Sequence, residues 1–357
     1  MVASTEKIAC AATACGYHII ADLIIERCLN YKTIACPPMT KRTVEIGARY
    51  SPDMVCTPFK TVLGNYIEAL ENGANVIVVP GAGCRLGFYD ILQKQILEDL
   101  GYDFEMIVLF DYVPTQRKMF SVLRDINPEL TAEKFTDVFG IAAQIAKDMD
   151  MLADIKRRNM AFELTKGEIN NHYNNYLREA MTAQTVAEAE KIGEKYKEKM
   201  EVAPKDKPDK PIRIGIVGET YGIGEAFLNC NTENWLIEHG VEINRNACLM
   251  SMVHTITHNS EVVEKCGEYA KYSLGATASE VIAHALEFAS NQIDGIIHIK
   301  PASCSPEISA MTILQNISRD FDVPILYMTF DTETSEAGVY TRLEAFMDMI
   351  VMKGLRK

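Results

Sequence analysis

The chain has 357 residues, more than one ordinary hydrophobic core accommodates, so we expect at least two domains. Its net charge of −13 argues against a nucleic-acid partner, because phosphate binding needs a basic surface. No apolar run reaches the length of about 18 residues that a membrane span requires, and the first residues lack the pattern of a signal peptide. We therefore expect a cytoplasmic protein without a membrane partner.

Ten cysteines are spread along the chain without the compact spacing of a disulfide framework. In a reducing compartment, cysteines are buried, catalytic or metal-binding. The C-x-x-C spacing of zinc ribbons and bacterial ferredoxins does not occur. The role of each cysteine therefore depends on where it lies relative to the expected helices and strands.

The first 130 residues alternate between helical and strand patterns, which predicts a parallel sheet with right-handed crossovers. A continuous β-branched run at residues 75–79 is typical of a buried parallel strand. The expected elements, in chain order, are helices at residues 17–29, 40–49 and from 57 to about 71, the strand at 75–79, a helix at 89–100 and a strand at 104–110.

The middle of the chain changes character. Residues 131–203 have helical periodicity, many Ala, Glu and Lys, and no cysteine, which predicts a helical module. Residues 204–211 contain three prolines among charges and form the expected linker. A second α/β domain follows at 212–357, with strands expected at 212–218, 295–299 and 324–328 and a last helix at 340–351. The predicted fold is thus α/β, with two Rossmann-like parallel-sheet domains (1–130 and 212–357) flanking a helical module.

Three cysteines lie at the boundaries of these elements. Ligands of open parallel sheets bind beyond the carboxyl ends of the strands. Cys84 and Cys304 each follow a predicted strand, and Cys56 precedes a predicted helix with Pro58 in its first turn. Helix N-termini lower thiol pKa values, and thiolates are the ligands of iron–sulfur clusters. Convergence of these cysteines in an interdomain cleft, where they would hold a cluster, is thus one interpretation of their positions.

A simpler interpretation of any single cysteine is that it is a small buried hydrophobe. It applies to five cysteines that sit in helix or strand patterns or have no distinguishing position: Cys10, Cys28, Cys230, Cys248 and Cys266. From the residues alone it also stays open for Cys56, Cys84 and Cys304.

Two further patterns have simple structural explanations. The glycine-rich segment at residues 215–224 superficially resembles a phosphate loop, but its glycine spacing favours a tight strand–helix turn over nucleotide binding. His254 and His258 are four residues apart, which suits two metal ligands on one helix face, yet a surface or N-cap role explains them equally well.

Four parts of the sequence together resemble the 2-hydroxyacyl-CoA dehydratase D-component superfamily, and within it the branch of acyl-CoA dehydratase activase-related or CoA protein activase proteins. The resemblance extends from about residue 33 to the C-terminus. The segments are PPMTKRTVEIG at 37–47 with CTPFKTVLGN at 56–65, GCRLGFY at 83–89, KPASCSPE at 300–307, and TRLEAF at 341–346.

This resemblance implies two Rossmann-like domains and a [4Fe-4S] cluster, held in family members by three cysteines; we carry these roles onto Cys56, Cys84 and Cys304. It implies low-potential electrons from an ATP-hydrolysing activase of the actin/sugar-kinase fold, and a homologous subunit or a homodimer as a further partner. One branch of the superfamily has a double-cubane cluster. The chain lacks the phosphate motifs of the activase itself, so it is not expected to be the ATPase.

Three functions stay open at this level. The first is a cluster-dependent reductase or a 2-hydroxyacyl-CoA dehydratase-like lyase, the second a non-catalytic carrier of electrons or clusters, and the third a cluster-free binding protein with buried cysteines. Cys36 is either a fourth ligand, which favours electron transfer, or a bystander. The sequence does not decide whether Arg42, Lys60, Arg85 and Arg342 contact a substrate or neighbouring carboxylates.

Overall fold

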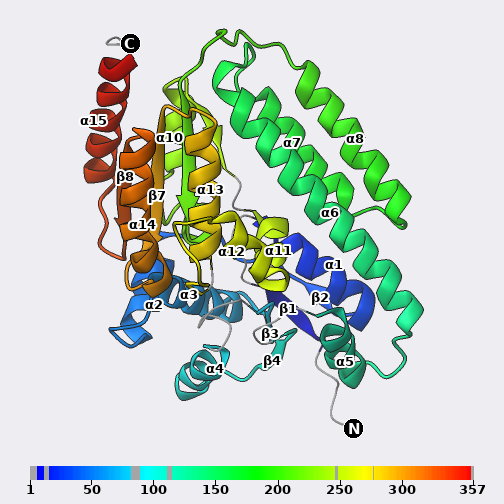
Figure 1. Cartoon of the computed structure of the whole chain (residues 1–357). Coiled ribbons are helices and arrows are strands. Elements are labelled where there is room, and N and C mark those ends of the chain that lie inside the picture. Colours follow the sequence, from blue (N-terminus) through cyan, green and yellow to red (C-terminus); the bar gives the residue numbers. More distant parts are fainter. Residues whose placement is uncertain are drawn as a thin grey trace. The chain divides into compact units, whose positions relative to one another are not determined.

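The computed structural model describes residues 6–11, 16–81, 89–110, 115–245, 248–275 and 277–354. The chain forms two compact units, each of which is described by itself. The first consists of Met1–Met149 and Asn175–Lys195, and the second of Asp150–Asn174 and Tyr196–Lys357. Each unit contains one four-stranded parallel sheet, so the predicted α/β class with two parallel sheets is confirmed (Figure 1).

The sheet of the first unit has the strand order β2-β1-β3-β4. Its strands are β1 (Ile8–Ala11), β2 (Lys32–Thr33), β3 (Val76–Val79) and β4 (Glu105–Val108). The last two were expected from the sequence, whereas β1 and β2 were not. β1 and β2 are short and lack a β-branched run, and pairing holds them: the Asn75 side chain accepts from the Ile8 amide at 2.8 Å and donates to the Glu6 carbonyl at 2.8 Å.

Helices connect these strands close to the predicted positions. They are α1 (His18–Leu29), α2 (Lys41–Tyr50), α3 (Thr57–Glu71) and α4 (Asp90–Asp99). A further helix, α5 (Gln116–Ile126), follows β4 and was not expected from the sequence. Nearly all of α3 is buried. Thr40 begins α2 with a capping box, in which its hydroxyl and that of Thr43 each bond to the backbone amide of the other residue.

Residues 131–203 are helical, as the sequence predicts. They form α6 (Ala132–Asn159), a short 3₁₀ turn (Met160–Phe162), α7 (Glu168–Ala180) and α8 (Val186–Val202). Each of the three long helices is divided between the two compact units. The predicted boundaries of the helical module and the linker stay predictions.

The sheet of the second unit has the strand order β6-β5-β7-β8, which is the pattern of the first sheet. Its strands are β5 (Arg213–Gly218), β6 (Glu242–Asn244), β7 (Gly295–Pro301) and β8 (Ile325–Phe330). The helices are α9 (Thr220–Gly224), α10 (Thr232–Glu238), α11 (Leu249–Thr257), α12 (Asn259–Lys265), α13 (Ala278–Ser290), α14 (Ser305–Phe321) and α15 (Glu336–Gly354).

Two apolar clusters enclose this second sheet. Side chains of α10 and α15 pack against one set of strand residues, and α12, α13 and α14 pack against the alternating set. Both faces of β7 are therefore buried, and all seven of its residues are buried, His298 and Lys300 included. Among the described residues, no helix is long and apolar enough to cross a membrane.

Candidate metal-ligating cysteines

Cys56 is the N-cap residue of α3 and is partly exposed. Its backbone is extended, with φ −67° and ψ 156°, and Pro58 follows in the first helical turn. Proline suits this position because the first amides of a helix have no intrahelical acceptor. The local sequence thus starts α3 at Cys56 and places the thiol at the positive end of a 15-residue helix.

The position of α3 is fixed by direct backbone contact with α2. A Cβ atom on Gly47 would lie 1.8 Å from the Lys60 carbonyl oxygen, and one on Gly64 would lie 2.0 Å from the Thr43 carbonyl oxygen. No side chain fits at either position without moving a helix. Gly47, from the segment 37–47, and Gly64, from the segment 56–65, therefore allow α2 and α3 to pack closely.

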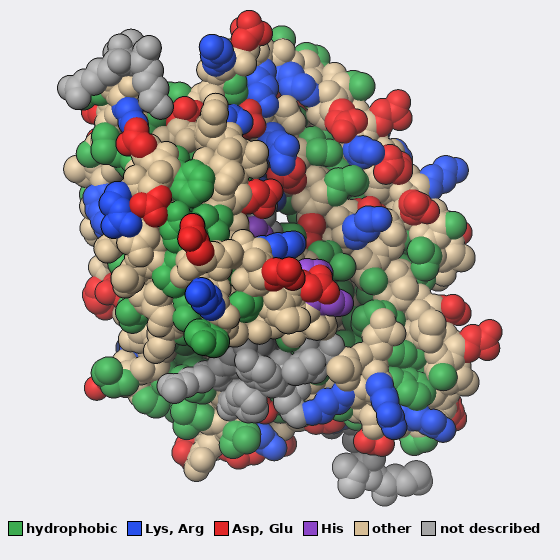
Figure 2. All heavy atoms as spheres, in the orientation of Figure 1, with side chains coloured by type: hydrophobic (Ala, Val, Ile, Leu, Met, Phe, Trp, Pro, Cys, Tyr) green, Lys and Arg blue, Asp and Glu red, His purple; other side chains and the backbone are tan. Residues whose placement is uncertain are grey.

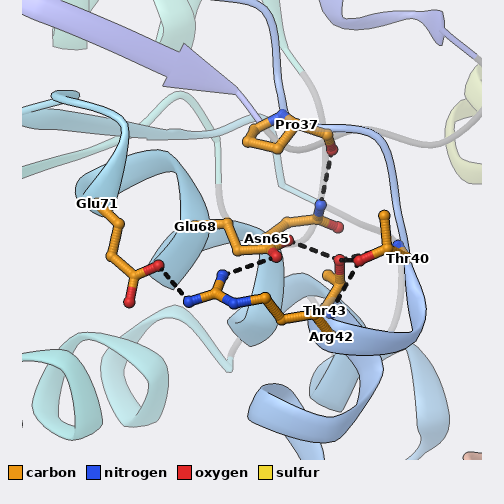
Figure 3. Close-up of polar contacts among 7 residues, drawn as sticks. All are labelled: Pro37, Thr40, Arg42, Thr43, Asn65, Glu68 and Glu71. Atoms are coloured by element: carbon orange, nitrogen blue, oxygen red, sulfur yellow. Dashed lines mark hydrogen bonds and ion pairs between the residues drawn. The ribbon is translucent and has the colours of Figure 1, made fainter.

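Arg42 and Thr43 of the segment 37–47 bond to carboxylates further along α3 and hold the two helices together (Figure 3). The Arg42 guanidinium donates to Glu68 at 2.9 Å and to Glu71 at 2.7 Å. The Thr43 hydroxyl donates to the second oxygen of Glu68 at 2.6 Å. Arg42 thus contacts neighbouring carboxylates, one of the two roles that the sequence left open.

Cys36 lies on a segment tied to the same helix. The Asn65 amide, on α3, donates to the Pro37 carbonyl at 3.0 Å (Figure 3). Cys36 itself is partly exposed, with its sulfur 3.6 Å from the Pro37 oxygen. The Lys60 ammonium donates to the Asp53 carbonyl at 3.3 Å, on the loop that leads to Cys56.

Cys304 repeats the arrangement of Cys56 in the second unit. It is the partly exposed N-cap residue of α14, and Pro306 follows in the first turn. The turn before it is strained, because Ser303 has a φ of +63°, in the left-handed region that non-glycine residues rarely adopt. The Ala302 amide donates to the Phe330 carbonyl at 2.7 Å and anchors the start of this turn on β8.

The glycine-rich segment after β5 forms a tight turn. Gly218 has a φ of +143°, and a Cβ there would lie 1.8 Å from the Ile299 carbonyl oxygen. The Glu219 carboxylate accepts from the amides of Tyr221 at 2.9 Å and Gly222 at 2.7 Å. The chain's own carboxylate thus occupies amide donors of the kind that bind phosphate in a nucleotide loop.

The cysteines of the described residues differ in burial and in thiol pKa. Cys10, Cys28 and Cys266 are at most 1% exposed. Burial raises the pKa of the thiols of Cys28 and Cys266 to about 11 and of Cys248 to about 12, and it also raises the pKa of Cys230. These groups are held as neutral thiols, as expected for buried cysteines. Cys36, Cys56 and Cys304 are partly exposed, as are Cys230 and Cys248.

Among the residues that it describes, the structure does not bring the other predicted site residues together. Cys84 and Arg85 lie outside the described residues. Cys56 and Cys304 belong to different units, and in the described part of the chain no three His, Cys, Asp or Glu side chains form a metal-ligating group. Arg342 donates to the Tyr327 carbonyl at 2.5 Å and lines a cavity of about 200 Å³ at the end of β8.

His254 and His258 stack on each other, with ring centroids 4.8 Å apart, and His254 lies 3.6 Å from the exposed Glu261. They belong to the surface of α11 and its C-terminal end. On the face drawn in Figure 2, Lys and Arg side chains are interspersed with Asp and Glu side chains. The expectation that no nucleic acid binds stays a prediction.

Sequence reasoning missed one buried polar group in the second unit. His298 and Glu307 are 0% exposed and hydrogen-bonded to each other. The charge of Glu307 also acts on the carboxyl groups of Glu219 and Glu280. A signal was present, since Glu307 follows Cys304 by one helical turn within the third motif segment.

No protein-family model matches the chain, and no curated protein matches it. The resemblance to the dehydratase superfamily rests on the four sequence segments alone.

Proposed function

We propose that this protein is an iron–sulfur protein in which thiolates of Cys56, Cys84 and Cys304 hold a [4Fe-4S] cluster. The observation that carries the proposal is the repeated arrangement of Cys56 and Cys304. Each is a partly exposed N-cap residue of a long helix, followed by Ser or Thr and then Pro. The positive end of a helix favours thiolate, the form that ligates iron.

The donor set fits a cluster better than it fits a hard cation, because thiolates are soft ligands. Four other cysteines have raised thiol pKa values, which leaves few cysteines suited to ligation. The strand order of each sheet agrees with a Rossmann-like half, in which ligands bind at the carboxyl ends of the strands. Both α/β units are proposed to be of this type.

When bound, such a cluster supplies one-electron reduction and, at an iron with an open position, a Lewis acid. The chain's own residues position the thiols: the α2–α3 contact fixes Cys56, and the anchored turn after β7 fixes Cys304. The electrons are proposed to come from an ATP-hydrolysing activase of the actin/sugar-kinase fold, for reductive or dehydratase-type chemistry in the cytoplasm. A homologous subunit or a second copy of the chain is the other proposed partner.

The test is anaerobic reconstitution with iron and sulfide, followed by metal and sulfide analysis and electron paramagnetic resonance of the reduced protein. We expect about four irons per chain, and twice that number for a double-cubane cluster. Cys56→Ser and Cys304→Ser should each lose most of the bound iron. The matched control is Cys230→Ser, which changes a partly exposed cysteine with a raised thiol pKa and should keep it. Wild-type protein without iron would refute the proposal.

A second function is favoured by one observation. Cys36 is partly exposed on the segment that Asn65 ties to α3. A fourth thiolate would saturate the cluster and make the protein an electron carrier. In that case Cys36→Ala should change the resonance of the reduced cluster and add a site for cyanide or another exogenous ligand. An unchanged spectrum makes Cys36 a bystander.

A further inference from the structure

A single buried carboxylate links three elements of the second unit. His298 on β7 and Glu307 on α14 are both 0% exposed, and the His298 Nε2 atom lies 2.8 Å from a Glu307 oxygen. The Thr277 hydroxyl, at the start of α13, donates to the other Glu307 oxygen at 3.0 Å. Glu307 is the third residue of α14, so the link reaches the turn that Cys304 caps.

Two more carboxyl groups, those of Glu219 and Glu280, interact electrostatically with Glu307. Glu219 follows β5 and accepts from two amides of its own turn. Glu280, on α13, is bonded to the hydroxyls of Ser251 and Thr255. Burial, with a smaller contribution from the charge of Glu307, raises the pKa of each group from 4.5 to about 7. Both are therefore substantially protonated near neutral pH, which reduces the negative charge around Glu307.

The elements that carry the pair and Thr277 also contribute to one apolar cluster, with Ile296 on β7, Ala278 on α13, and Ala310 and Leu314 on α14. Hydrophobic side chains of similar volume would stabilise such a layer at least as well, because two ionisable groups lose their hydration on burial. The pair is thus better explained by the geometry it imposes than by stability. The hydrogen bond between Glu307 and His298 attaches the first turn of α14 to the central strand β7.

The attachment lies next to the strained turn that carries Cys304. Ser303 has a φ of +63°, and such a conformation persists where the flanking structure over-determines it. On one side, the Ala302 amide is bonded to the Phe330 carbonyl. On the other side, Glu307 is bonded to His298. The turn of Ser303 and Cys304 is held between these two anchors.

We infer that Glu307, through its bond to His298, is a positioning residue that fixes the orientation of the Cys304 thiol. The inference rests on the proposed function, because it takes Cys304 as a ligand. Cys56 provides an internal comparison. It caps α3 in the same way, but the first turn of α3 has no acidic residue, and backbone contact with α2 holds that helix instead.

The experiment uses the full-length protein without iron. Hydrogen–deuterium exchange and the alkylation rates of Cys304 and Cys56 are compared among wild type, Glu307→Ala and Glu307→Gln. Glu307→Gln keeps the shape and one acceptor oxygen, while the other oxygen becomes an amide donor. We expect exchange of the 302–310 amides to rise about tenfold in Glu307→Ala, because the turn opens locally. The Cys304-to-Cys56 alkylation ratio should change with it, and Glu307→Gln should restore both towards wild type.

After reconstitution, Glu307→Ala should also alter the resonance of the reduced cluster. Uniform loosening of the whole unit, or an unchanged alkylation ratio in folded Glu307→Ala, would overturn the inference. If Glu307→Ala does not fold, His298→Gln is measured with the same outcomes. Because exchange and alkylation are read without iron, a wild type that binds no cluster refutes the proposed function and leaves this test intact.

Discussion

The contact between α2 and α3 makes a quantitative prediction for Gly64→Ala. The added Cβ would lie 2.0 Å from the Thr43 carbonyl oxygen, whereas ordinary contact begins at 3.4 Å. Because the obstacle is backbone, no rotamer change relieves it, and the helices must separate by roughly 1 Å. The separation also stretches the bonds of Glu68 to Arg42 and Thr43.

Two opposing effects set the size of the change. Overpacking of this kind costs about 3 kcal/mol, at the upper end of its usual range, because the clash is with a main chain. Replacing glycine with alanine inside a helix returns about 1 kcal/mol. The net loss is about 2 kcal/mol, which lowers the melting temperature of a unit of this size by about 4–8 °C.

The assay is urea or thermal unfolding followed by circular dichroism, with Gly140→Ala as the matched control. Gly140 lies inside α6, and its added Cβ would meet only the end of the Val186 side chain, at 3.1 Å. We expect that variant to be as stable as wild type or more stable by up to about 1 kcal/mol. A Gly64→Ala protein that unfolds at or above the wild-type midpoint would refute the packing argument.

Two further substitutions test the buried polar groups. The pKa of Glu280 is raised from 4.5 to about 7, so the folded state favours its neutral form. The stability that this preference contributes is fully present below pH 4.5 and is lost as the pH rises through 7. The free energy of unfolding is measured from pH 4.5 to 7.5, and in Glu280→Gln its decrease over this range should be smaller than in wild type by about 3 kcal/mol. If the decrease is the same in both proteins, the raised pKa of Glu280 is contradicted. Thr43→Val removes the 2.6 Å bond to buried Glu68 and half of the capping box, so denaturant unfolding should show a loss of about 2 kcal/mol, with unaltered stability as the contrary result.

Local patterns in the sequence were sufficient for most elements. The β-branched runs predict β3, β5 and β7, and helical periodicity predicts α3 and the three long helices of residues 131–203. The positions of the helix starts at Cys56 and Cys304 also follow locally, because a proline two residues later suits a first turn. These features depend on residues a few positions apart, which a single sequence displays.

The short strands escaped prediction because their stability is not local. β1 and β2 contain four and two residues; β2 pairs with β1, and β1 pairs in turn with β3. Likewise, the contact of Gly47 and Gly64 with opposite backbones involves residues that the sequence shows only as unremarkable helix positions. Contacts between distant segments carry no signature in local propensity.

The cysteines show the same division. The sequence by itself determined that Cys56 and Cys304 begin helices, and it supplied the chemistry of thiolate ligation. Only the tertiary structure decided that Cys28 and Cys266 are sealed from solvent, that Arg42 is committed to two carboxylates, and that Glu307 ties the Cys304 turn to β7. The physical reason is that burial and side-chain pairing depend on which segments meet, whereas helix initiation depends on the residues of a single turn.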